Sequence, residues 1–262
     1  MAKEQKVIYY SDELHEDFAN NGVKAKKVSE NYKYLSKNPF SRFFGKLLWI
    51  IFLPVAWLVA FILYHPKFVG KKNVLKKVKK KGYFIYSNHV LSVDPLVPPT
   101  MVNPTKYCII AASPDTFSIN KALSWIIKSF GGFPIPNCPE MYNNYLEYIK
   151  FHINKKHKVL MYPEAHIWPY CNWIRHYTST SFKYPVMLNA PIITMTTCFI
   201  SKKPGKKPKK VIYVDGPFYP NQDLKFADAV EDLRNQAFEQ MNQRAKQYST
   251  CEYVKYVKKT SE

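Results

Sequence analysis

An apolar run in the N-terminal third of the chain constrains the fold more than any other feature. Every residue from 47 to 64 is aliphatic, aromatic or proline (LLWIIFLPVAWLVAFILY). A helix of this length approaches the roughly 20 residues that cross the hydrocarbon core of a bilayer. A buried core helix is the alternative, but such helices normally keep a polar stripe, which this run lacks. We therefore predict a membrane-embedded helical segment over residues 43–66, kinked at Pro54.

Basic residues flank this segment on both sides, namely Arg42 and Lys46 before it and Lys67, Lys71 and Lys72 after it. Because cytoplasmic flanks carry the excess of Lys and Arg, this symmetry gives a spanning helix no preferred orientation. A kinked segment that enters and leaves the same leaflet satisfies both flanks. The N-terminus lacks the apolar core of a secretory signal, and five scattered cysteines suit a reducing compartment. We expect a monotopic protein on the cytoplasmic face of the cell membrane.

The chain carries a large excess of positive charge, with 39 Lys and Arg residues against 19 Asp and Glu residues and a formal net charge of +20. This balance indicates an anionic partner, either nucleic acid or a negatively charged membrane surface. Two lysine-rich runs, residues 71–81 and 202–210, are either solvated surface or, beside the apolar segment, contacts for anionic lipid headgroups. Because the sequence has no aromatic and basic platform for nucleic acid, we expect a membrane with anionic lipids as the partner.

The length of 262 residues fits one principal domain with an appended segment. We predict a polar, irregular N-terminal arm over residues 1–42, because it shows no sustained helical or strand period, the membrane-embedded segment over 43–66 and a main domain over 67–262. In the main domain, short apolar runs alternate with amphipathic stretches, which predicts an α/β fold with a mostly parallel sheet flanked by helices. The expected strands cover residues 83–87, 106–111, 158–162, 191–198 and 210–214, and the expected helices cover 116–130, 140–154, 179–189 and 224–247.

Polar residues follow two of these strands directly. His89 comes after the strand at 83–87, and Glu164 comes after the strand at 158–162. In open α/β sheets, ligands bind outside the carboxyl ends of the strands. If both strands run parallel, His89 and Glu164 emerge at the same edge of the sheet, and this edge is where we expect the chemistry.

His89 and Asp94 are a candidate acid-base pair. Five residues apart, they would lie about 140° apart around a regular helix, so they meet only if the chain turns between them. Pro95 favours such a turn because it disfavours helical geometry at Asp94. A neutral histidine can take a proton from an alcohol near pH 7, and an aspartate can orient its ring. The alternative is a turn histidine beside an aspartate that only caps a helix.

The motif N-H-x4-D at Asn88 to Asp94, followed by Tyr-Pro-Glu at residues 162–164, resembles the glycerolipid acyltransferase family, particularly bacterial 1-acylglycerol-3-phosphate acyltransferases. The resemblance covers about residues 83–214 and extends to an N-terminal membrane segment. It implies that His89 is the general base, that Asp94 orients it and that Glu164 helps to hold the acceptor. The main domain would then be the acyltransferase domain.

The chain departs from the family pattern where the family contacts the acceptor's phosphate. The stretch G-G-F-P-I-P-N ends in Asn137, where family members often carry Arg, and Ala165, His166 and Ile167 stand where Gly, Thr and Arg are usual. The usual V-I-P-V of the fourth motif is replaced by the sequence at residues 192–195. An anionic headgroup would need other cations, and the candidates are Arg175, His166, His176 and Lys183.

We therefore expect an enzyme that moves a fatty acyl group from acyl-CoA or acyl-carrier protein to the free hydroxyl of a lysophospholipid, with 1-acylglycerol-3-phosphate as acceptor and phosphatidic acid as product. His89 and Asp94 are the expected catalytic residues, and the expected substrate contacts are Asn88, Glu164, His166 and Arg175. No cofactor is implied, and no cluster of ligand residues has metal-binding spacing. The alternatives are another lysolipid or glycolipid acceptor, or a non-catalytic lipid-binding protein.

Overall fold

The computed structural model describes residues 5–19, 28, 32–35, 38–118, 120–202 and 206–259. Its central sheet has the strand order β2-β8-β7-β3-β6-β4-β5. Neighbouring strands run parallel except β7 and β8, which are antiparallel, so the predicted mostly parallel sheet is confirmed. The strands are β2 (Lys67–Val69), β3 (Tyr83–Ser87), β4 (Cys108–Ala112), β5 (Gly132–Pro134), β6 (Lys158–Met161), β7 (Ile192–Ile200) and β8 (Lys209–Phe218).

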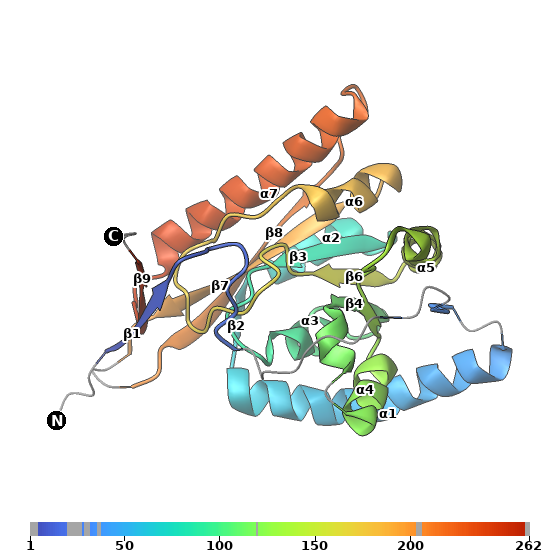
Figure 1. Ribbon diagram of the computed structural model, residues 1–262, viewed down its shortest axis with the longest axis horizontal. Helices are drawn as coiled ribbons and strands as arrows, with labels where there is room; N and C mark the ends of the chain where they lie inside the picture. Colours follow the sequence, from blue (N-terminus) through green and yellow to red (C-terminus); the bar gives the residue numbers. More distant parts are fainter. Residues whose placement is uncertain are drawn as a thin grey trace.

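Helices flank the sheet, with α5, α6 and α7 on one side and α1, α3 and α4 on the other (Figure 1). The helices expected over residues 116–130 and 179–189 are both divided, because the 3-10 helices η2 (Pro114–Phe117) and η4 (Thr180–Phe182) precede shorter α-helices. The helices are α1 (Pro39–Tyr64), α2 (Lys71–Val78), α3 (Val97–Met101), α4 (Lys121–Ser129), α5 (Tyr142–Asn154), α6 (Lys183–Met187) and α7 (Phe226–Tyr248).

The central strand β3 divides the core into two apolar layers. Phe84 and Tyr86 pack in the layer with α5 and α7, whereas Tyr83 and Ile85 pack in the layer with α1, α2 and α3. All four side chains are fully buried. Because successive residues of a strand point to opposite faces, a strand covered on both faces is apolar throughout. This explains why a continuous apolar run in the sequence predicted β3.

Helix α1 contains the whole apolar run and begins earlier than predicted, at Pro39. It changes direction near its middle in Figure 1, where Pro54 removes a backbone donor. Among the described residues, it is the one helix that is long and apolar enough to cross a membrane. Most of its circumference is exposed, and its buried side chains form one stripe, made of Trp49, Ala56, Ala60 and Tyr64.

Several segments have regular structure that the sequence did not indicate, including β2, β5 and α3. Within the predicted arm, β1 (Lys6–Tyr10) pairs in parallel with β9 (Val254–Lys258), so the interpretation of the arm as irregular is wrong there. The lysine-rich run at 71–81 contains helix α2, whose Val74 and Val78 are buried one turn apart. Residues 20–27 and 29–31 of the arm lie outside the described residues.

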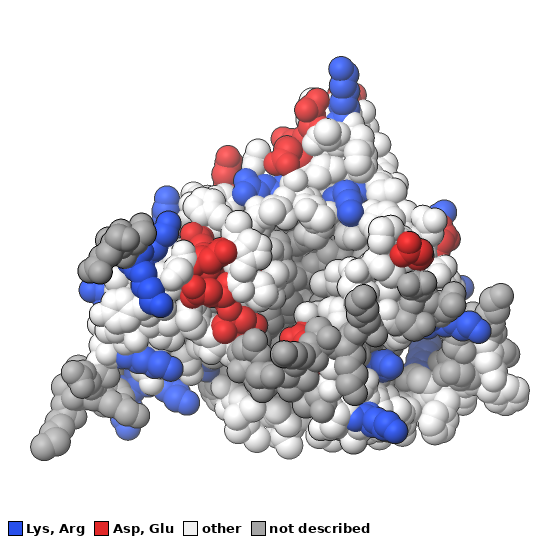
Figure 2. Space-filling model, viewed as in Figure 1, with Lys and Arg blue, Asp and Glu red and all other residues white. Residues whose placement is uncertain are grey.

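Charges of opposite sign separate on the face shown in Figure 2. Acidic side chains gather over the N-terminal segment after β1, which contains Asp12, Glu13, Glu16 and Asp17. The lower right of the same view, where α1 runs in Figure 1, shows basic side chains and no acidic ones. On this face, the surface around the right-hand part of α1 is therefore apolar and basic, which suits contact with anionic lipid.

Candidate active site

The carboxyl end of β3 leads into a tight turn that brings His89 and Asp94 together. Nδ1 of His89 lies 3.1 Å from Oδ2 of Asp94. The same carboxylate oxygen accepts the backbone N–H groups of Val90 at 2.7 Å and of Leu91 at 2.8 Å. One oxygen thus holds both the ring and the turn. The predicted turn between the two residues is present, and it does what a regular helix could not.

This arrangement leaves the other ring nitrogen of His89 available. A carboxylate beside Nδ1 stabilises the tautomer with its proton there, which makes Nε2 the acceptor. Among the described residues, His89 Nε2 has no hydrogen-bond partner. The residue is 9% exposed, so the ring is held by the protein and still reachable. The pair therefore has the geometry of a general base with its orienting carboxylate.

Tyr162 supports the ring of His89 from one side. The two rings stack with centroids 4.0 Å apart and an interplanar angle of 17°. Burial, together with the nearby charge of Asp94, raises the pKa of the Tyr162 hydroxyl well above 10, so it stays protonated. This contact was not predicted, although Tyr162 is the first residue of the Tyr-Pro-Glu motif. Aromatic character directly after a strand is the signal that could have identified it.

Glu164 reaches the same edge of the sheet, as predicted from parallel strands, and joins three separate groups. Its Oε2 accepts the backbone N–H of His89 at 3.1 Å and lies 3.1 Å from the Arg175 guanidinium. Its Oε1 accepts the backbone N–H of Arg175, also at 3.1 Å. The Arg175 guanidinium further donates to the carbonyl of His166 and stacks over Trp168, 4.9 Å from the ring centroid.

Both partners of this ion pair are buried, and Arg175 is fully so. A buried charge is stable only when it is paired and hydrogen-bonded, and here the two groups pair with each other, although Nε of Arg175 has no hydrogen-bond partner among the described residues. Neither Glu164 nor Arg175 presents a free charged group to the surface. In the structure, Glu164 contacts the backbone N–H of His89, and Arg175 contacts Glu164. The predicted contact of these two residues with the acceptor stays a prediction.

The side chain of Asn88 forms hydrogen bonds to the backbone of Thr197, which links the end of β3 to β7. Its side chain accepts the backbone N–H of Thr197 at 2.9 Å and donates to the Thr197 carbonyl at 3.1 Å. The hydroxyl of Thr197 lies 2.7 Å from the hydroxyl of Tyr64, the last residue of α1. The apolar helix is therefore linked through two residues to the turn that carries the candidate base.

His166 is the predicted substrate residue that remains accessible. Its side chain is 33% exposed, and Nδ1 lies 3.7 Å from Asp17 of the N-terminal segment. Ala165 before it has a φ of 61°, a left-handed conformation that glycine adopts most easily. The family's usual Gly at this position has that physical reason, and the alanine adopts the same turn.

The N-terminal segment closes over this loop. The indole N–H of Trp168 donates to the carbonyl of Glu16 at 2.7 Å, and the backbone N–H of His176 donates to Glu13 Oε1, also at 2.7 Å. No motif in the sequence pointed to these contacts, because they join residues more than 150 positions apart. The acidic segment therefore forms part of the wall beside the candidate site.

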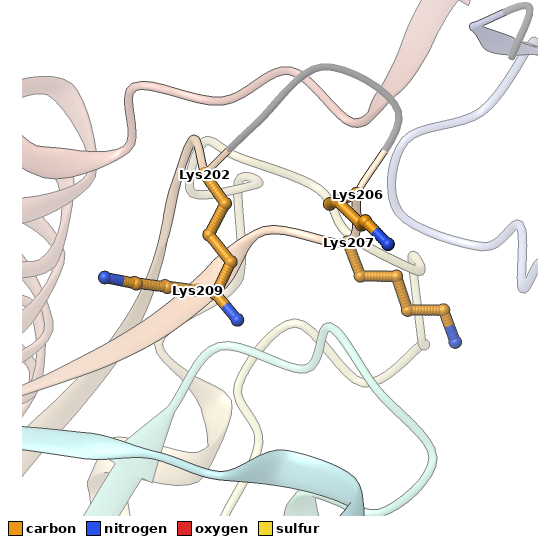
Figure 3. Close-up of a pocket in the computed structure, with 4 residues that line it drawn as sticks. All are labelled: Lys202, Lys206, Lys207 and Lys209. Carbon is orange, nitrogen blue, oxygen red and sulfur yellow. The ribbon is translucent and has the colours of Figure 1, made fainter. Parts of the chain in front are cut away.

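A basic pocket of about 690 Å³ lies beyond the carboxyl end of β7, at the sheet edge that also carries His89. It is lined by four lysines, whose extended side chains are shown in Figure 3, and they are Lys202, Lys206, Lys207 and Lys209. This is the second lysine-rich run of the sequence. Its position makes it a candidate contact for an anionic substrate group.

Among the described residues, no group of three or more His, Cys, Asp or Glu side chains is arranged to hold a metal ion. The candidate site is thus a histidine, its orienting aspartate and a supporting tyrosine. Such a site can activate a hydroxyl group by removing its proton.

Comparisons with known proteins give a family and a fold. The family model described as "Acyltransferase" matches residues 65–197. A solved structure, the 1-acyl-sn-glycerophosphate (LPA) acyltransferase PlsC from Thermotoga maritima, is similar, with a TM-score of 0.55 and 14% sequence identity. The similarity covers 83% of this chain and 87% of that one. No curated protein sequence matches.

Proposed function

Because the chain belongs to the Acyltransferase family, we propose that it transfers a fatty acyl group from acyl-CoA or acyl-carrier protein to the hydroxyl of 1-acylglycerol-3-phosphate, giving phosphatidic acid. The observation that carries this proposal is the pair of His89 and Asp94, with Nε2 of His89 free to accept a proton. The fold shared with PlsC supports it, since PlsC is named for this acceptor class.

In the proposed reaction, Nε2 of His89 takes the proton of the acceptor hydroxyl as its oxygen attacks the thioester carbonyl. The carboxylate of Asp94 stabilises the imidazolium that results. The tetrahedral intermediate then expels the thiolate, which takes up the proton from His89 and leaves as a thiol. One C–O bond forms, one C–S bond breaks, and His89 returns to its neutral state.

Glu164 and Arg175 act, in this proposal, through the backbone of His89 and not by touching the substrate. The hydrogen bond from the His89 N–H to Glu164 fixes where the turn begins, and Arg175 holds the carboxylate in place. Asn88 anchors the same turn to β7. Of the four predicted substrate contacts, His166 is then the one that reaches the acceptor headgroup.

The four-lysine pocket beyond β7 is the proposed contact for the donor. Acyl-CoA and acyl-carrier protein both carry phosphate, and carrier proteins are acidic, so a pocket lined by four lysines suits either. Substituting Lys202, Lys207 and Lys209 with Gln should raise the KM for acyl-CoA and leave kcat nearly unchanged. An unchanged KM would remove the pocket from the proposal.

The proposed location is a membrane surface, with α1 lying along it. The buried stripe of α1 runs from Trp49 to Tyr64, so the helix contacts the domain along most of its length. A helix that crossed the bilayer alone would be surrounded by lipid at that depth. The exposed apolar side chains opposite the stripe would enter one leaflet, as in a monotopic protein on the cytoplasmic face.

A second acceptor class has one observation in its favour. Asn137 is exposed and uncharged where family members often carry the Arg that contacts the phosphate. An acceptor without a phosphomonoester, such as another lysolipid or a glycolipid, would not need that charge. The same assay distinguishes the two classes.

The test supplies the purified full chain with acyl-CoA and either 1-acylglycerol-3-phosphate or monoacylglycerol, which lacks the phosphate. We expect phosphatidic acid from the first and slow turnover of the second. The His89→Ala variant should lose activity by about a thousandfold or more while vesicle binding persists. Full activity in His89→Ala would refute the proposal, and equal rates with both acceptors would favour the second acceptor class.

A further inference from the structure

A second basic pocket, of about 500 Å³, lies beside the first half of α1. Residues 104–107 and 155–157, which line it, precede β4 and β6, so it lies at the amino ends of these strands. His89 follows the carboxyl end of β3, at the opposite edge of the sheet. From Trp49 at this pocket to Tyr64 near Asn88, the helix rises roughly 22 Å. The pocket is therefore separate from the candidate active site.

The pocket gathers positive charge without any carboxylate among its lining residues. Five lysines contribute, and they are Lys46, Lys79, Lys106, Lys155 and Lys156. Their convergence is visible at His157, whose pKa is lowered to about 4, first by burial and then by the charges of Lys46, Lys106 and Lys155. Like charges gathered at one place favour a bound anion.

A buried donor without a partner also lines this pocket. Trp49 is 5% exposed, and its indole N–H has no hydrogen-bond partner among the described residues. Leaving a buried donor unpaired is energetically costly, so such a group usually serves an acceptor. An indole N–H on the wall of a pocket that five lysines also line is suited to a phosphate oxygen.

The remaining wall identifies the kind of anion. Trp49, Ile50 and Leu53 belong to α1, and Ile50 is 52% exposed, continuous with the apolar side of the helix. A soluble phosphate compound has no apolar surface to bury against this wall. An anion whose headgroup enters the pocket while its acyl chains follow the exposed side of α1 would bury both parts.

We propose that this pocket binds the phosphate group of an anionic membrane phospholipid that is neither acceptor nor product of the reaction. The five lysines and the Trp49 N–H hold the headgroup, and the acyl chains lie against α1. Such a lipid would fasten the first half of α1 to the membrane, at the opposite edge of the sheet from His89. Because it concerns binding alone, the proposal stands independently of acyl transfer.

The test measures binding of the full chain to vesicles of phosphatidylcholine alone and of phosphatidylcholine mixed with phosphatidylglycerol, without acyl donor. The pocket variant carries Lys46→Gln, Lys79→Gln and Lys155→Gln. Its matched control carries Lys72→Gln, Lys76→Gln and Lys77→Gln, which removes the same charge from exposed positions of α2. We expect the pocket variant to lose about tenfold more affinity for mixed vesicles than the control.

A third variant, Trp49→Phe, removes the donor without changing the charge. It should bind mixed vesicles about tenfold more weakly and neutral vesicles as before, since a hydrogen bond to a charged group is lost. Circular dichroism and acyl transfer in detergent should match the unmodified protein. Equal losses in the two triple variants would overturn the proposal. So would wild-type binding by Trp49→Phe, or release from mixed vesicles by inorganic phosphate, which would make soluble phosphate the ligand.

Discussion

Oδ2 of Asp94 lies 3.1 Å from Nδ1 of His89 and within 2.8 Å of two backbone nitrogens in the turn between them. One carboxylate oxygen therefore serves the ring and the backbone at once. The other oxygen is buried and has no hydrogen-bond partner in the described part of the chain. A group so placed contributes its charge as well as its shape, and the two contributions can be separated by substitution.

The Asp94→Asn variant tests that separation. The amide oxygen can still accept the two backbone N–H groups, so the melting temperature should change little. Without the negative charge, the imidazolium is no longer stabilised, and kcat should fall by about 10²–10⁴-fold. Steady-state kinetics and thermal unfolding check the two parts. Activity within threefold of the unmodified protein would contradict the assigned role.

The Glu164→Gln variant distinguishes support of the fold from contact with the acceptor. Removing one charge of a buried pair leaves the Arg175 guanidinium uncompensated, which should cost about 3–5 kcal/mol of unfolding free energy. If Glu164 instead touches the acceptor, the KM for that acceptor should rise while the melting temperature stays constant. Denaturant unfolding and acceptor titration together decide between the two outcomes.

Two substitutions at Tyr162 test the ring that stacks on His89. Tyr162→Phe keeps the ring and removes a buried hydroxyl that has no partner among the residues the structure describes, so activity should be retained and stability should not fall. Tyr162→Leu removes the stacked ring and should lower kcat by about tenfold, because the imidazole loses a fixed orientation. Identical kinetics for both variants would show that stacking does not matter.

The parts of the fold that the sequence could predict are those set by local pattern. Strand β3 was located at its observed ends because both faces are buried, and the pairing of β3 with β6 placed His89 and Glu164 at one edge. Strand β1 was missed because it exists only through pairing with β9, at the other end of the chain. Helix α2 was obscured by its lysines, although Val74 and Val78 stand at helical spacing.

The candidate site was predictable to the same degree. His89 and Asp94 follow from a motif with fixed spacing, and their meeting required only a turn. The burial of Arg175 could not be foreseen, because it lies in a loop without periodicity and its partners come from residues 13, 164 and 166. Whether a charged loop residue faces substrate or its own fold depends on tertiary packing, which one sequence does not reveal.

Two histidines outside the candidate site predict how stability changes in acid. Burial and their mutual proximity lower the pKa of His152 to about 3, and burial and three lysines lower that of His157 to about 4. The unfolded chain binds protons at these residues near pH 6.5, whereas the folded chain does so only below pH 4. Stability should therefore fall from pH 6.5 toward pH 3, by about 1.4 kcal/mol per pH unit for each histidine.

The variant His152→Phe keeps an aromatic ring beside Tyr107 and removes one of these groups. Its unfolding free energy should depend less steeply on pH between about 4 and 6.5, because one titrating group is lost. The slope should be smaller by about 1.4 kcal/mol per pH unit. Urea unfolding at several pH values measures the difference directly. Parallel curves for the two proteins would mean that His152 does not titrate differently in the folded and unfolded chain.

The hydrogen bond between Tyr64 and Thr197 would couple the depth of α1 in the membrane to the position of the candidate active site. In the proposed monotopic arrangement, α1 lies in one leaflet and sets the height of its final residue, which is two contacts from the turn that carries His89. The imidazole would then be held at a fixed level relative to the lipid surface. His89 would not reach lipids whose hydroxyl lies higher or lower in the headgroup layer. The height of the hydroxyl would therefore select among acceptors before the protein contacts any headgroup.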